Sequence, residues 1–106
     1  MIHNELDLTL VRRFKSAAQK ALPGRIARVV LFGSRARREA GRHSDWDVAV
    51  FLKDQASSRD TFALADAAYD LIVETGDTIH PIALSEVGGD SNPLLLEQIA
   101  SDGIPV

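Results

Sequence analysis

The sequence predicts an α/β (α+β) domain, built from a small mixed β-sheet with helices packed on one face. Two short apolar runs, Val29–Phe32 and Val48–Leu52, are rich in β-branched and aromatic residues and end at turn signals, as buried strands do. Before them, apolar residues recur every four positions from Leu6 to Leu22, which is the spacing of an amphipathic helix. Helix-like and strand-like segments continue to alternate after Leu52, which is the order expected of an α/β sheet.

The first half of the chain is expected to form a helix over residues 5–22 and strands over residues 26–32 and 48–52. Pro23 and Gly24 end the helix, because proline cannot continue it and glycine tolerates the turn that follows. The apolar stripe of this helix consists of Leu6, Leu10, Phe14, Ala18 and Leu22.

A further helix is expected over residues 59–74. Ser57 or Ser58 can cap its N-terminus, and Gly76 ends it. Its period predicts a face turned to the core, formed by Phe62, Ala65, Ala68, Tyr69, Ile72 and Val73.

The last elements are a strand over residues 77–84 and a helix over residues 94–102. Pro81 makes the strand an edge strand, since a proline has no N–H to donate to a neighbouring strand. Asn92 and Pro93 open the helix and Gly103 follows it, which is the usual asymmetry of helix ends.

Length and composition indicate one domain over residues 1–106, without space for a second recognition domain. Hydrophobic residues make up 45% and charged residues 25% of the chain, which is typical of globular proteins. There is no cysteine, so disulfides and thiolate metal sites are excluded. No apolar run approaches the roughly 18 residues of a membrane span, and the expected location is the cytoplasm.

Charge is distributed unevenly along the chain. All 12 Lys and Arg residues lie at or before Arg59, whereas the residues from Asp60 onward are acidic or uncharged. A protein that binds extended DNA or RNA should be basic more evenly, so such binding is not expected. The acidic part suits a basic protein partner, although it can equally be a solvated helix face.

The chemistry is expected between the first two strands. Gly33 follows the first strand directly and lets the backbone turn sharply toward a ligand. Ser34 can cap a short helix over residues 35–40, ended by Gly41, whose free N–H groups suit a phosphate. Each of these features taken alone is more often a simple turn.

Asp45 and Asp47 lie two residues apart where the second strand opens, so their side chains project from the same face. Two neighbouring carboxylates repel each other unless a cation lies between them. A hard divalent ion such as Mg²⁺, bound to nucleotide phosphates, removes that repulsion. A phosphate site facing two carboxylates is therefore expected to carry out phosphoryl or nucleotidyl transfer.

The motif Gly33-Ser34-x-Ala36-Arg37, followed by Ser44-Asp45-x-Asp47 with ten residues between Ser34 and Asp45, resembles the signature of the minimal nucleotidyltransferase (MNT) domains. These domains, which include MntA-like antitoxins, belong to the DNA polymerase β-like nucleotidyltransferase superfamily. The resemblance implies that Gly33 and Ser34 hold the triphosphate and that Asp45 and Asp47 bind Mg²⁺ in catalysis. It marks Arg37 as a recurring residue that either contacts phosphate or supports the loop through a carboxylate.

One residue departs from this pattern. The third strand of the family usually supplies another carboxylate, but residues 78–82 contain none. The alignment places His80 at that position, and Asp77 is the nearest carboxylate. A neutral His80 could accept the proton of an attacking hydroxyl, or it could be a strand residue hydrogen-bonded beside Pro81.

The resemblance implies a transferase that moves AMP from ATP, or a nucleoside monophosphate from another NTP, to a hydroxyl. Small MNT proteins commonly pair with a helical HEPN protein as antitoxin and toxin, and can AMPylate that partner. The alternative is a weakly active or inactive domain that binds nucleotide or metal and acts by occupying its partner. An antibiotic adenylyltransferase is less favoured, because no second domain is available to bind the acceptor.

Overall fold

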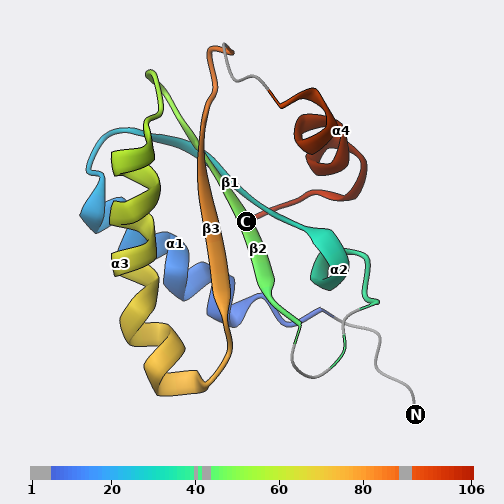
Figure 1. The fold of residues 1–106 in the computed structure, drawn as a ribbon. Coiled ribbons are helices and arrows are strands. Elements are labelled where there is room, and N and C mark those ends of the chain that lie inside the picture. Colours follow the sequence, from blue (N-terminus) through green and yellow to red (C-terminus); the bar gives the residue numbers. More distant parts are fainter. Residues whose placement is uncertain (1–5, 40, 42–43, 89–91) are drawn as a thin grey trace.

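The computed structural model of the chain describes residues 6–39, 41, 44–88 and 92–106. Helices and strands alternate along most of it (Figure 1). In chain order the elements are α1 (Thr9–Ala21), β1 (Ile26–Phe32), α2 (Gly33–Ala36), β2 (Trp46–Leu52), α3 (Ser58–Thr75), β3 (Ile79–Ser85), α4 (Pro93–Asp102) and β4 (Ile104–Pro105).

The strands form one mixed sheet in the order β3-β2-β1-β4. β2 runs antiparallel to β1 and parallel to β3, and β4 runs antiparallel to β1. β3 is an edge strand, as Pro81 predicts. On that edge the N–H of Ala83 donates to the hydroxyl of Thr61 at 3.1 Å. The predicted mixed sheet is confirmed, whereas the two-residue strand β4 was not predicted.

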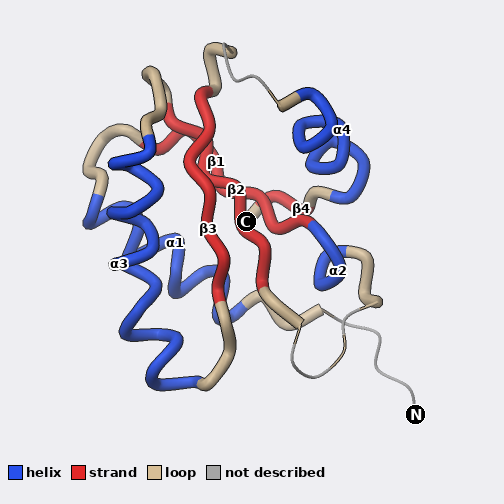
Figure 2. Tube along the Cα trace, in the orientation of Figure 1, coloured by secondary structure: helices blue, strands red, loops and turns tan. Residues whose placement is uncertain are grey.

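Helices cover both faces of the sheet (Figure 2). α1 and α3 pack on one face, where Phe14 and Leu64 meet alternate residues of the central strands such as Leu31 and Val48. α4 lies on the opposite face, where Ile99 packs with the other set of strand residues. The expected packing on one face therefore holds for the two long helices but not for α4. Because β1 and β2 are apolar at nearly every position, both faces of the sheet need a cover.

The prediction for the short helix was wrong at both ends. α2 begins at Gly33 and ends at Ala36, so Ser34 lies inside the helix and does not cap it. Gly33 has φ +77°, and this left-handed conformation turns the chain from β1 into the helix without a linker. Gly41 lies beyond the helix and does not end it.

α3 begins and ends as predicted but presents a different face to the core. Ser57 and Asp60 form a reciprocal capping box, and Gly76 ends the helix with φ +76°. The fully or nearly buried apolar residues are Leu64, Ala68 and Leu71. Of the residues predicted to face the core, Ala68 is buried and Ile72 packs against the core. Three large ones are instead exposed: Phe62 at 70%, Tyr69 at 64% and Val73 at 66%. Ala65 is exposed as well.

The last helix agrees closely with expectation, whereas the first begins later than predicted. α1 begins at Thr9, whose N–H donates to the Asp7 carboxylate at 2.9 Å. The predicted start at residue 5 lies outside the described residues, and residues 6–8, which are described, are not helical. Asn92 caps α4, and Pro93 occupies its first turn. No helix in the described part of the chain is long and apolar enough to cross a membrane.

Candidate functional site

Gly33 and Asp47 are brought together where β1 ends and β2 begins. Phe32 pairs with Asp47 across the antiparallel ladder, so the turn at Gly33 lies over the Asp47 carboxylate. A Cβ atom added to Gly33 would lie only 2.5 Å from Oδ2 of Asp47. Glycine is therefore required both for its positive φ and for the approach of this carboxylate.

His80 lies on the other side of Asp47. The parallel register pairs Asp47 of β2 with His80 of β3, and Nδ1 of the imidazole lies 3.3 Å from Oδ1 of the carboxylate. The His80 side chain is 73% exposed and the Asp47 side chain 29% exposed. Asp77 precedes β3, and its N–H donates to the hydroxyl of Thr75. The neighbour of Asp47 on the third strand is thus an imidazole and not a carboxylate.

Asp45 lies two residues before Asp47, and Ser34 lies one residue after Gly33. Asp45 is exposed just before β2 and forms no ion pair with any described residue. The half-buried Ser34 lies in α2, where its carbonyl accepts the N–H of Glu39 at 3.0 Å. Within the described residues its hydroxyl has no hydrogen-bond partner.

Arg37 is held by carboxylates. Its Nη1 donates to Asp102 of α4 at 2.8 Å, and its Nε donates to Glu39 at 3.0 Å. The hydrogen bond with Asp102 is the main reason that the pKa of Arg37 is raised. Of the two expected roles, this geometry favours support of the loop. The contact with Asp102 joins the end of α2 to the end of α4, and no sequence signal links two residues so far apart.

A cavity of about 350 Å³ opens beside Asp47 and His80, on the side of the sheet that α4 covers. This volume is within the range of small-molecule sites. Sequence analysis missed the lining residues that come from α3 and α4, because only tertiary packing brings them to this place. The cavity is lined by Phe32, Asp47, Thr61, His80, Pro81, Ile82, Leu95 and Gln98.

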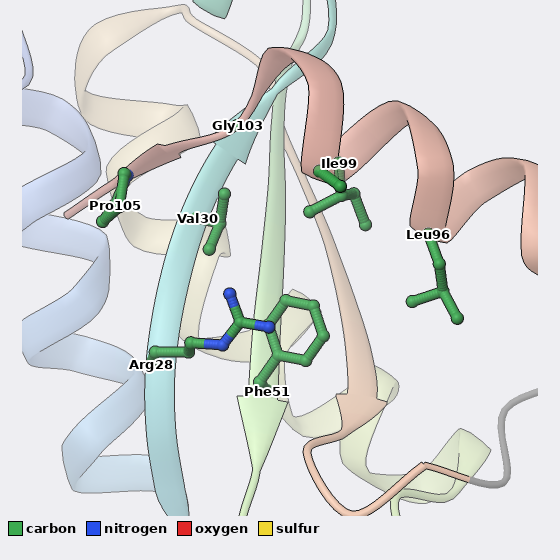
Figure 3. Close-up of a pocket in the computed structure, with 8 residues that line it drawn as sticks. Arg28, Val30, Phe51, Leu96, Ile99, Gly103 and Pro105 are labelled. Atoms are coloured by element: carbon green, nitrogen blue, oxygen red, sulfur yellow. The ribbon is translucent and has the colours of Figure 1, made fainter.

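A second cavity of about 400 Å³ lies near β4 (Figure 3). Its wall includes Arg28, whose guanidinium carbon lies 3.9 Å from the centroid of the Phe51 ring. Arg28 also donates to Glu86 at 2.8 Å, so its charge is already paired. None of the residues predicted for the site lines this cavity.

The carboxylates of Asp45 and Asp47 are better suited to binding an ion that enters with its nucleotide than to forming a closed metal site. Among the described residues, no group of three or more His, Cys, Asp or Glu side chains could hold a metal ion alone. Mg²⁺ is usually bound by one or two carboxylates together with substrate phosphates and water. Asp45 and Asp47 match that donor set.

Comparison with known proteins identifies the family. The model of the polymerase β nucleotidyltransferase family matches residues 14–106. This chain belongs to that family. No curated protein matches it. The family and the nucleotidyltransferase fold inferred from the Gly33-Ser34 and Asp45-x-Asp47 motif are thereby confirmed.

Solved structures share the nucleotidyltransferase fold. A toxin–antitoxin structure with AMP-PNP has a TM-score of 0.69 at 20% identity, over 89% of this chain and 69% of that chain. A mutant of the MntA–HpeT toxin–antitoxin has a TM-score of 0.68 at 18% identity, with the same coverage of 89% and 69%. The tri-AMPylated HEPN toxin from Shewanella oneidensis in complex with MNT antitoxin gives 0.53 at 17% identity, over 87% and 70%. At these identities the likeness is one of fold.

Proposed function

We propose that this nucleotidyltransferase domain transfers AMP from ATP, with Mg²⁺, to a hydroxyl of a HEPN-type protein partner, as the antitoxin of a toxin–antitoxin pair. The observation that carries the proposal is the contact of Asp47 with both the Gly33 turn and His80, beside a cavity of suitable size. The choice of a HEPN-type partner is suggested by the similar fold of an MNT antitoxin in complex with an AMPylated HEPN toxin.

The turn and the two carboxylates share the binding of the nucleotide. Gly33 brings the backbone close to the triphosphate, and the Ser34 hydroxyl has no competing partner among the described residues. Asp45 and Asp47 would hold the Mg²⁺ that accompanies the phosphates, and the bound ion would supply neutralisation of charge on the leaving pyrophosphate. Arg37 is bound to Asp102 of α4 and to Glu39, so we assign it to positioning the Gly33 turn.

His80 is placed to receive the proton of the acceptor. When Nδ1–H donates to Asp47, the lone pair of the neutral ring lies on Nε2. The exposed ring leaves Nε2 accessible to an incoming hydroxyl. The hydroxyl oxygen attacks the α-phosphorus of ATP and forms an O–P bond. The bond to the bridging oxygen breaks, pyrophosphate leaves with its electron pair, and the hydroxyl proton passes to His80.

Transfer of label from ATP tests this function. The chain is incubated with Mg²⁺ and a co-expressed HEPN-type protein, with ATP labelled at the α-phosphorus in one reaction and at the γ-phosphorus in another. We expect label on the partner from α-labelled ATP alone, because AMP is transferred and pyrophosphate leaves. Label on the partner from γ-labelled ATP, or from neither, would contradict the proposal.

The role of His80 is tested by two variants measured side by side. We expect His80→Ala to lower the transfer rate about 10²-fold or more, the lower range for loss of a general base, with little change in nucleotide affinity. Asp77→Ala should keep the parent rate, because Asp77 lies before β3 and not beside Asp47. An unaffected His80→Ala with an inactive Asp77→Ala would instead identify Asp77 as the third catalytic group.

A second candidate function is binding of nucleotide or metal without transfer. The observation that favours it is the imidazole beside Asp47, since Mg²⁺ prefers oxygen ligands. In that case the parent transfers little or no AMP, and His80→Asp raises the activity by adding an oxygen ligand. In the transferase proposed above, the parent is already active.

A further inference from the structure

The exposed face of α3 carries an apolar stripe, formed by Phe62, Ala65, Tyr69 and Val73. Their spacing of three, four and four residues places them along one side of the helix. Among the described residues only two other large hydrophobic side chains are strongly exposed, Val87 and Leu94, and neither is on α3. Three exposed large apolar side chains in line on one helix indicate an interaction surface.

The stripe has an acidic border. Asp66 and Asp70 are exposed next to it, and within the described residues neither has an ion-pair partner. Glu74 is already bound by Arg13 of α1, and the sole base within α3 is Arg59 near its start. An antiparallel pair of two such helices would bring the acidic borders of both copies close together. Like charges at an interface are unfavourable, so the border favours a basic partner over a second copy.

The neighbouring edge of the sheet is closed to strand addition. Pro81 of β3 has no N–H, and the N–H of Ala83 is already bound by Thr61. A partner that adds a strand to a sheet needs free N–H groups along the edge. A partner that binds this side of the molecule is therefore expected to contact the surface of α3.

The stripe begins beside the candidate site. Thr61 lines the cavity that contains Asp47 and His80, and Phe62 is the next residue of α3. A protein bound along the stripe therefore lies next to a residue that lines that cavity.

We propose that the α3 stripe is the docking surface for an amphipathic helix of the HEPN-type partner, one whose apolar ridge is bordered by Lys and Arg. This inference rests on the proposed function for the existence of that partner. The ridge covers Phe62, Tyr69 and Val73, and the basic border meets Asp66 and Asp70, as in other helix-to-surface complexes.

Binding of the co-expressed HEPN-type protein tests the surface. We expect Tyr69→Ala/Val73→Ala to weaken binding at least 10-fold, mainly through faster dissociation, since buried aromatic anchors dominate interface energy. Asp66→Asn/Asp70→Asn should slow association and reduce its dependence on salt. The matched control Val87→Ala/Leu94→Ala removes exposed apolar area elsewhere and should bind like the parent. Melting temperatures and ATP binding of all three variants should match the parent.

Four outcomes decide between the ideas. Weaker binding by the stripe variant, with parent-like binding by the Val87→Ala/Leu94→Ala control, supports the docking surface. Equal binding by the stripe variant and the parent overturns it and leaves the transferase proposal intact. A parent that binds no HEPN-type protein overturns both proposals. A parent that sediments as a dimer, and becomes monomeric on Tyr69→Ala, assigns the stripe to a second copy and overturns the choice of partner.

Discussion

Asp47→Asn is expected to lower AMP transfer by about 10³-fold, which corresponds to about 4 kcal/mol of transition-state stabilisation. The substitution keeps the shape of the side chain but removes its charge, which weakens it both as a ligand for Mg²⁺ and as the acceptor of the hydrogen bond from His80. Without metal the variant should be as stable as the parent or slightly more so, because one of two neighbouring carboxylates has been neutralised. Label transfer and thermal unfolding measure the two effects. A variant that binds Mg²⁺ and ATP and transfers AMP like the parent would show that Asp47 belongs to no such site.

Gly33→Ala should reproduce this loss without altering any charge. The added methyl group would lie 2.5 Å from Oδ2 of Asp47, so the carboxylate or the turn must move. Gly24→Ala is the matched control, because Gly24 has a similar φ of +75° but no atom within 4 Å of the added Cβ. Both variants bear the strain of a positive φ, about 1 kcal/mol, and only Gly33→Ala disturbs Asp47. Equal AMP transfer by the two variants would contradict the assigned contact.

The centre of the site was predictable because its chemistry lies within a short stretch of chain. An antiparallel pair of consecutive strands necessarily brings the end of β1 to the start of β2, so Gly33 and Asp47 meet. The place of His80 was predicted from the family pattern, and the parallel register pairs this residue with Asp47. The walls of the cavity were not predictable, because Gln98 and Leu95 come from a helix whose packing depends on the whole fold.

The face that α3 turns to the core could not be chosen from periodicity. Leu64 and Leu71 lie on one side of the helix, Phe62 and Tyr69 lie on another, and both sets repeat at helical spacing. Side-chain size favours the aromatic set, which is the choice that proved wrong. Burial of a charged residue near the start of α3, Asp60, marks the side that faces inward.

Asp60 is held in this position by a cation from the loop before β1. Nη1 and Nη2 of Arg25 donate to the two carboxylate oxygens of Asp60 at 2.7 and 3.0 Å. Asp60 also accepts the N–H of Ser57 within the capping box. The side chain is 9% exposed, compared with 59% for Asp54, the other carboxylate bound by Arg25. Because Asp60 is desolvated and Asp54 is not, breaking the ion pair with Arg25 costs more free energy of folding at Asp60 than at Asp54.

Asp60→Ala is expected to lower the free energy of unfolding by about 2–3 kcal/mol, the sum of about 1 kcal/mol for the cap and the remainder for the charged hydrogen bonds. Asp54→Ala, the control, should lose less than about 1 kcal/mol because that carboxylate is solvated. Urea unfolding of the two variants and the parent measures the difference. Equal losses would mean that the buried pair contributes no more than the exposed one.

The same pair predicts how stability depends on pH. The hydrogen bond from Arg25 is the main reason that the pKa of Asp60 lies below its ordinary value of 3.8. On acidification the Asp60 carboxylate is therefore protonated at a higher pH in the unfolded chain than in the folded one. The contribution of Asp60 to the free energy of unfolding is complete well above pH 3.8 and disappears as the pH falls through the folded-state pKa. Asp60→Ala should therefore show a shallower loss of stability than the parent on acidification below about pH 4. Parallel pH profiles for the parent and the variant would show that the titration of Asp60 contributes nothing to folding.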